Sequence, residues 1–199
     1  MPNYMIPAEN TFYEQSIKRS RFLTWIYPSA TPEIAKQHLR TVQQQYPDAR
    51  HICWAWIAGA PNSSHLGMSD DGEPSGTAGK PMLNVLQHKG IGEITVIVVR
   101  YFGGIKLGTG GLSRAYSSSV SEALKITPLI QCVQMQPIHL RCIYAEEDYI
   151  RRLLNSHAAI IDHCDYQEKV QLACQIPTEN LAKFQQQLAF NIELKIIDL

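Results

Sequence analysis

Two glycine-containing segments combine the residue types that bind anions. Residues 69–81 read SDDGEPSGTAGKP, and residues 100–115 read RYFGGIKLGTGGLSRA. Each runs into a predicted helix, so backbone N–H groups at the helix start would point at an anion. The nearby cations are Lys80 in the first segment and Lys106 and Arg114 in the second. The glycines that would let a ligand or another backbone approach closely are Gly103, Gly104, Gly108 and Gly110.

The established phosphate-binding motifs do not fit these segments. A P-loop needs a lysine directly after its second glycine, whereas Gly108 is followed by Thr109. The pattern G-x-G-x-x-G fails as well, because Ser113 stands where its third glycine is required. A structural alternative is that both segments are tight turns pressed against one another. The identity of a ligand is therefore open at this point.

Three carboxylates in the first segment are candidate metal ligands. Asp70, Asp71 and Glu73 could hold a hard cation such as Mg²⁺ through oxygen atoms. Their spacing does not match a calcium loop, and acids in a glycine-containing loop are commonly just solvated. These acids could also pair with the basic residues near 18–21 until a polyanion competes for those cations. The sequence predicts no resident metal and no cofactor.

His51 and Cys53 raise the question of nucleophilic catalysis. Residues two apart on a strand face the same way, so the imidazole could activate the thiol. Such a pair also needs an orienting group and an oxyanion site, and the sequence supplies neither. A buried cysteine beside a histidine is the commoner outcome, so we expect binding rather than catalysis.

Basic residues spread over the first 131 positions suggest a nucleic-acid surface. They would neutralise phosphates, and the exposed aromatics would accept unstacked bases. The candidate aromatics are Tyr101 and Phe102, with the alternative that both end a core strand and are buried. The candidate phosphate contacts are Arg19, Arg21, His51, Arg100, Lys106 and Arg114, with Lys80 shaping the site.

The composition is that of a globular protein. The chain has 199 residues, of which 45% are hydrophobic and 18% charged, with a formal net charge of zero. Residues 1–131 carry 12 Lys/Arg against 9 Asp/Glu, and residues 132–199 carry 6 against 9, so the basic face belongs to the first part. The odd number of cysteines, five, without any C-x-x-C spacing, argues against disulfides and predicts a cytoplasmic protein. Neither a signal peptide nor a membrane-spanning run is recognisable, so no membrane partner is expected.

Hydrophobic periodicity predicts the elements that position these residues. Strands are expected over residues 16–27, 52–59 and 93–101, the last being β-branched and apolar enough for a central strand. A helix should begin at Pro32 with Thr31 as its N-cap, and two more should span 77–90 and start at Thr109. Residues 61–76 are expected to form a polar loop.

The sequence predicts two domains, residues 1–131 and residues 132–199. All twelve glycines lie between Gly59 and Gly111, and Pro128 and Pro137 interrupt the pattern near the boundary. After residue 137 the periodicity predicts the order β-α-β-β-α-β, which is the ferredoxin-like arrangement. The predicted fold class is therefore α+β.

Residues 69–83 (SDDGEPSGTAGKPML) and 99–116 (VRYFGGIKLGTGGLSRAY) resemble the signature of the IMPACT family. The upstream strings KRSRF and ARHICWAW are also similar to that family's first domain. The resemblance covers most of residues 16–125, and the second domain is similar in pattern to the module that bacterial members append. No departure from the signature is seen.

This resemblance implies a first domain with an α/β sandwich shared with a small-subunit ribosomal protein and with the fourth domain of elongation factor G. The second domain would be similar to the fifth domain of that factor. It also implies a translation-linked role, because eukaryotic family members regulate translation under amino-acid starvation. Fold analogy alone does not fix a function.

Three functions follow as hypotheses. The first is a non-enzymatic, RNA- or ribosome-associated protein that affects translation. The second is an enzyme or sensor that binds a phosphorylated small molecule at the glycine-rich segments. The third is a protein-interaction module whose loops dock a protein partner in translation control.

Overall fold

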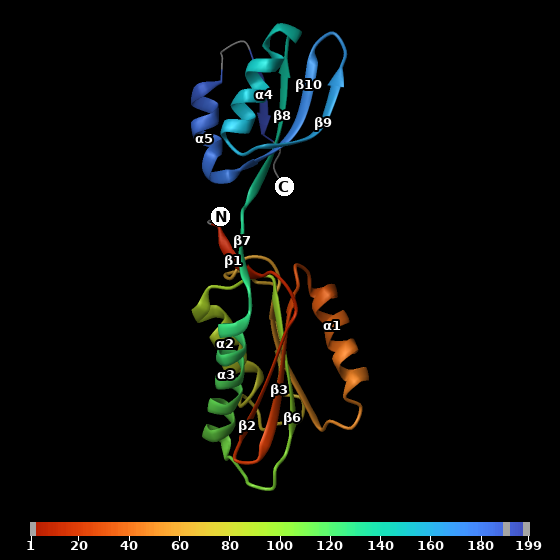
Figure 1. The fold of residues 1–199 in the computed structure, drawn as a ribbon, viewed down its shortest axis with the longest axis vertical. Coiled ribbons are helices and arrows are strands. Elements are labelled where there is room, and N and C mark those ends of the chain that lie inside the picture. The colour runs from red at the N-terminus through yellow and green to blue at the C-terminus, as the bar shows by residue number, and fades with distance from the viewer. Residues whose placement is uncertain (1–2, 189–191, 197–199) are drawn as a thin grey trace. The chain divides into compact units, whose positions relative to one another are not determined.

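The computed structural model describes residues 3–188 and 192–196. The chain divides into two compact units, one spanning Tyr4–Cys132 and the other comprising Asn3 and the residues from Val133 onward. Each unit combines helices with an antiparallel sheet, so the protein is α+β (Figure 1). In the described part of the chain, none of the helices is both long and apolar enough to cross a membrane.

The N-terminal unit is built on a five-stranded antiparallel sheet. The strand order is β2 (Thr11–Ile17), β3 (Ser20–Pro28), β6 (Ile94–Tyr101), β4 (His51–Ile57) and β5 (Leu66–Ser69). The central position of β6 confirms the prediction from its β-branched run, and its residues from Ile94 to Arg100 are buried. A separate ribbon pairs β1 (Tyr4–Pro7) with β7 (Leu129–Cys132), and neither strand was predicted.

Helices cover both faces of this sheet (Figure 1). The helices α2 (Gly79–Lys89) and α3 (Thr109–Ile126) pack on one face, where Phe22, Val98 and Tyr116 lie in the core. The helix α1 (Pro32–Gln45) packs on the other face over a smaller apolar cluster. Thr31 caps α1 by accepting a hydrogen bond from the Ile34 N–H, which confirms the predicted N-cap.

Two predictions for this unit were wrong. The single strand expected over residues 16–27 is a hairpin, because the chain turns at Lys18 and Arg19 with φ of 46° and 66°. A two-residue hairpin loop of type I′ needs positive φ at both positions, and glycine or asparagine usually marks it, so the sequence carried no signal for this turn. The polar loop expected over residues 61–76 contains the short edge strand β5, which pairs with β4.

The C-terminal unit has the predicted ferredoxin-like order. Its strands are β8 (Met135–Cys142), β9 (Ile160–Tyr166), β10 (Val170–Pro177) and β11 (Glu193–Ile196), and they form a sheet in the order β11-β8-β10-β9. A 3-10 turn, η1 (Tyr144–Glu146), leads into α4 (Glu147–Ser156), and α5 (Thr178–Gln187) follows β10. Both helices contribute to one apolar core with the inward side chains of the strands.

Gly103 fixes the second glycine segment against the β2–β3 hairpin. A Cβ placed on Gly103 would lie 2.0 Å from the carbonyl carbon and oxygen of Arg19. The Gly103 N–H donates a hydrogen bond of 3.2 Å to Ser20 Oγ, which closes the contact. At this position the glycine admits another backbone, which is one of the two uses that the sequence left open.

Replacing Gly103 with alanine should destabilise the N-terminal unit. The added methyl group has no room beside the Arg19 backbone, so Gly103→Ala should lower the free energy of unfolding by about 1–3 kcal/mol. Gly110→Ala is the control, because its Cβ would meet only Arg114 Nη1 at 3.6 Å within a helix. The control should be neutral or stabilising by up to about 1 kcal/mol.

Urea unfolding of the full chain, followed by tryptophan fluorescence, measures both variants. All three tryptophans lie in the N-terminal unit, so the signal reports that unit. Equal stability losses for the two variants would contradict the close packing at Gly103.

Candidate functional site

Strand register places a cation, Arg100, on the face of the sheet that α2 and α3 cover. Side chains alternate along β6, so Arg100 follows Val96 and Val98 toward the α2/α3 side. Arg100 lies between Phe22 on β3 and His51 on β4, its direct neighbours in the pairing. Its guanidinium is therefore buried, with 7% of the side chain exposed, and requires a partner.

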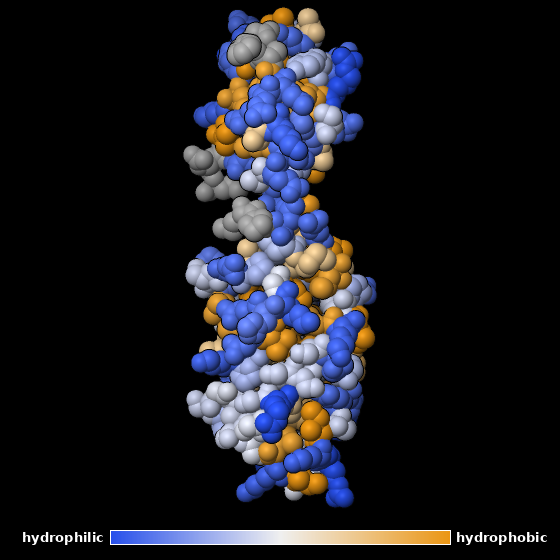
Figure 2. Space-filling view, turned by 90° about the vertical axis from the view of Figure 1, so that its left-hand side faces the viewer, coloured by the Kyte–Doolittle hydropathy of each residue, from blue (hydrophilic) through white to orange (hydrophobic). Residues whose placement is uncertain are grey.

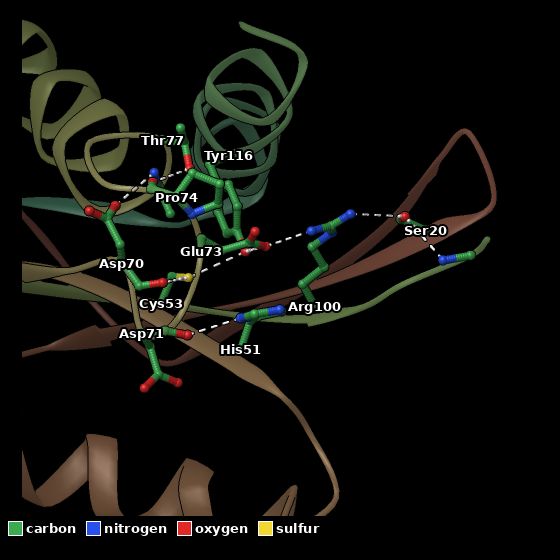
Figure 3. A network of polar contacts seen from close by, with 12 residues as sticks. Ser20, His51, Cys53, Asp70, Asp71, Glu73, Pro74, Thr77, Arg100 and Tyr116 are labelled. Atoms are coloured by element: carbon green, nitrogen blue, oxygen red, sulfur yellow. Dashed lines mark hydrogen bonds and ion pairs between the residues drawn. The ribbon is translucent and has the colours of Figure 1, made fainter. Parts of the chain in front are cut away.

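Glu73 is that partner. Arg100 Nη1 lies 2.7 Å from Glu73 Oε1, and the Glu73 side chain is 3% exposed. The Tyr116 hydroxyl on α3 donates to the same oxygen at 2.8 Å, and Arg100 Nη2 lies 3.5 Å from Ser20 Oγ. These contacts join the first glycine segment to β6, α3 and the hairpin (Figure 3).

Cys53 extends the same network but is not an activated nucleophile. Its sulfur lies 2.9 Å from the Asp70 carbonyl oxygen and 3.3 Å from the Tyr116 hydroxyl. Burial raises the pKa of the Cys53 thiol to about 12, and burial likewise raises the pKa of Tyr116. The thiol is therefore protonated at neutral pH, which disfavours the nucleophilic use of the His51–Cys53 pair.

Asp70 and Asp71 organise the loop that carries Glu73. Asp70 accepts hydrogen bonds from the backbone N–H groups of Gly76 and Ala78, just before α2, and of Gly79, its first residue. The Asp71 carboxylate accepts a hydrogen bond of 2.7 Å from the Ile52 N–H. The backbone carbonyl oxygen of Asp71 lies 3.0 Å from His51 Nδ1. The three acids thus have separate partners, and no cluster suited to a metal ion occurs among the described residues.

A cleft of about 750 Å³ lies beside the Arg100–Glu73 ion pair in the N-terminal unit. Its walls include the basic side chains of Arg50, His51, Arg100 and Lys106 and the aromatic side chains of Tyr101 and Phe102. Gly108 and Thr109, at the start of α3, also line it. Gly108 has φ of +73° and gives α3 no side-chain cap, so the first N–H groups of that helix remain available to an anion.

Two acids, Asp48 and Glu73, also line this cleft, and each makes a contact within the protein. Glu14 pairs with Arg21 at 2.7 Å, Asp48 accepts from the Tyr101 hydroxyl at 3.0 Å, and Glu73 holds Arg100. Cations that make no ion pair with any described residue remain around the cleft and the hairpin: Lys18, Arg19, Arg50, Lys106 and Arg114. Strongly hydrophilic side chains gather at the lowest end of the unit, where the hairpin and the second glycine segment turn (Figure 2).

The structure brings together part of the predicted set. His51, Arg100, Lys106 and Gly108 share the cleft. Arg114 lines a smaller hollow of about 290 Å³ with Lys18, Leu107 and Gly111, beside the hairpin that carries Arg19 and Arg21. Gly104, with φ of +86°, lies in the loop between β6 and α3, and Gly110 lies in the first turn of α3. Lys80 is exposed on α2 and does not line the cleft.

Two features of the site were missed from the sequence. Arg50 lines the cleft although nothing marked it out, because its position depends on the turn between α1 and β4. The pairing of Glu73 with Arg100 was missed too. Alternation along β6 was a usable signal, since it places Arg100 on the same face as Val98.

Comparison with known proteins gives the family. Residues 18–124 match the family model "Impact N-terminal domain", and residues 140–189 match a domain of unknown function, DUF1949. The IMPACT family member YigZ of Escherichia coli is 44% identical over 95% of this chain and 93% of its own. The chain belongs to the IMPACT family. A Haemophilus influenzae member is 40% identical over 94% of this chain and 92% of its own.

A solved structure agrees in fold over the full length. A crystal structure titled as that of a hypothetical protein is 42% identical and covers 100% of this chain and 98% of its own, with a TM-score of 0.73. The predicted IMPACT family membership is confirmed by the family model and the curated relatives.

Removing the charge of Asp70 should lower the stability of the N-terminal unit, because this carboxylate caps the start of α2. Burial raises the pKa of Asp70, but the hydrogen bonds from Gly76, Ala78 and Gly79 outweigh it and lower the pKa below its ordinary value of 3.8. Ionised Asp70 therefore stabilises the folded state above that value, and this stabilisation is lost as the pH falls through the folded pKa. Both oxygens of Asp70 accept backbone N–H bonds, so the NH2 group in Asp70→Asn would face a donor, and the free energy of unfolding should fall by about 1 kcal/mol at pH 7.

The difference between Asp70→Asn and the wild type should shrink as the pH is lowered to about 3. Urea unfolding at both pH values measures it. A difference that stays constant would show that the charge of Asp70 does not stabilise the loop.

Proposed function

We propose that the N-terminal unit binds RNA through the cleft and the cations around it. The observation that carries this proposal is that Arg50, Lys106 and Arg114 have no ion-pair partner among the described residues, while Glu73, one of the two acids that line the cleft, is neutralised by Arg100. Unpaired cations around an open helix N-terminus attract a polyanion and release its counterions on binding. RNA is a polyanion of that kind, and the exposed Phe102 adds a surface for a base.

The proposal extends to a non-catalytic role in translation. Membership in the IMPACT family supports it, since the resemblance implies regulation of translation, and ribosomal RNA or tRNA in the cytoplasm would be the partner. The protonated state of the Cys53 thiol at neutral pH supports binding rather than covalent catalysis.

Salt dependence of RNA binding tests this proposal. For each phosphate contact removed, the slope of log K against log salt should fall by about 0.7 for single strands. The double variant R50A/K106A should therefore flatten the slope by about 1.4, if each side chain contacts one phosphate. Lys80→Ala is the matched control, because Lys80 is an exposed cation that does not line the cleft.

The measurement is a fluorescence-anisotropy titration of a short single-stranded RNA, with sedimentation on ribosomes before and after nuclease as a second arm. A slope that R50A/K106A leaves unchanged removes these cations from the interface. Ribosome binding that survives nuclease and high salt would favour a protein partner instead.

A phosphorylated small molecule is a second candidate for the same cleft. The observation in its favour is the volume of about 750 Å³, which lies within the range of small-molecule sites. Calorimetric titration with inorganic phosphate, a sugar phosphate and a nucleoside monophosphate distinguishes the two candidates. Saturable binding of one of these with no affinity for RNA would replace the RNA proposal.

A further inference from the structure

Phe102 is an exposed aromatic residue on a firmly held stretch of backbone. It follows directly after the central strand β6 and is 57% exposed. Exposing a phenyl ring to water gains nothing for folding, because burial of apolar area is what stabilises the folded state. The ring lines the same cleft as Arg50 and Lys106, so a ligand bound in that cleft would contact it.

The backbone on both sides of Phe102 is fixed. Tyr101, which precedes it, pairs with Arg21 on β3. Gly103, which follows it, donates to Ser20 Oγ and approaches the Arg19 backbone too closely for any other residue. The Arg100 guanidinium also lies over the Phe102 ring, 5.7 Å from its centroid. The ring is therefore presented with little conformational freedom to lose on binding.

The other aromatic side chains at this end are occupied. Tyr101 is half-buried and donates its hydroxyl to Asp48, whereas Phe102 is 57% exposed. Phe22 is fully buried in the core. Of the two aromatic side chains that line the cleft, Phe102 is the more exposed.

We infer that Phe102 stacks on one unpaired base of an RNA strand whose phosphate lies near Lys106 and the N-terminus of α3. This inference rests on the proposed function and narrows it to single-stranded RNA. Lys106, Gly108 and Thr109 line the same cleft as Phe102, so one nucleotide would contact both parts. In a duplex the faces of the bases are covered by their neighbours, so only an unpaired base can stack on the ring.

Binding of an unstructured oligonucleotide and of its duplex to the full chain tests the inference. Phe102→Ala should weaken single-strand binding about 5- to 150-fold, the loss typical of one stacked base. Phe102→Trp should restore it, and duplex binding should be unchanged by either variant. Ile105→Ala is the matched control, since Ile105 is an exposed apolar residue of the same loop and should have little effect.

The outcomes separate this inference from the proposed function. Salt-dependent RNA binding that Phe102→Ala leaves intact would overturn stacking but keep the RNA proposal. Loss of affinity that Phe102→Trp does not restore would also overturn it, since stacking needs only an aromatic face. A free nucleoside monophosphate that binds as tightly as the oligonucleotide would overturn the assignment to a strand. Failure of the wild type to bind any RNA would overturn both proposals.

Discussion

The buried ion pair between Arg100 and Glu73 is the interaction on which this end of the molecule depends. A cation buried between the sheet and the helices α2 and α3 is tolerated only with a partner. Breaking a buried ion pair costs about 3–5 kcal/mol. Glu73 serves both Arg100 and the Tyr116 hydroxyl, so it ties the first glycine segment to β6 and α3. Asp70 and Asp71 hold the same loop in place through backbone hydrogen bonds, so the position of Glu73 beneath Arg100 depends on all three acids of that segment.

The fold was predictable wherever a single segment carried its own pattern. The apolar run of β6, the cap at Thr31 and the alternation in β8 and β10 identified their elements from local sequence. The hairpin turn at Lys18–Arg19 could not be predicted, because neither residue type favours the left-handed backbone that the pairing of β2 with β3 imposes. The ribbon of β1 and β7 joins segments more than 120 residues apart, which no local pattern encodes.

The candidate site was predictable in its parts but not in its pairings. The two glycine segments drew attention to Lys106 and Gly108, which do line one cleft. The choice of Glu73 for Arg100, and of Asp70 for the start of α2, depends on the distance between segments after folding. Lys80 was expected to shape the site because it stands beside a glycine-rich helix start, but it lies outside the cleft. Charges near one another in sequence therefore indicated the region, and tertiary packing decided which of them remained unpaired.

The central claim is that the free cations, Phe102 and the start of α3 form one binding surface. Backbone amide chemical shifts of the full chain, followed by NMR during titration with an unpaired RNA tetranucleotide, test it most directly. The account predicts that the shifts change at Arg50 and over residues 102–111 and saturate together, while β8 and β10 are unaffected. Changes concentrated on the sheet of the C-terminal unit, with residues 102–111 unperturbed, would contradict it.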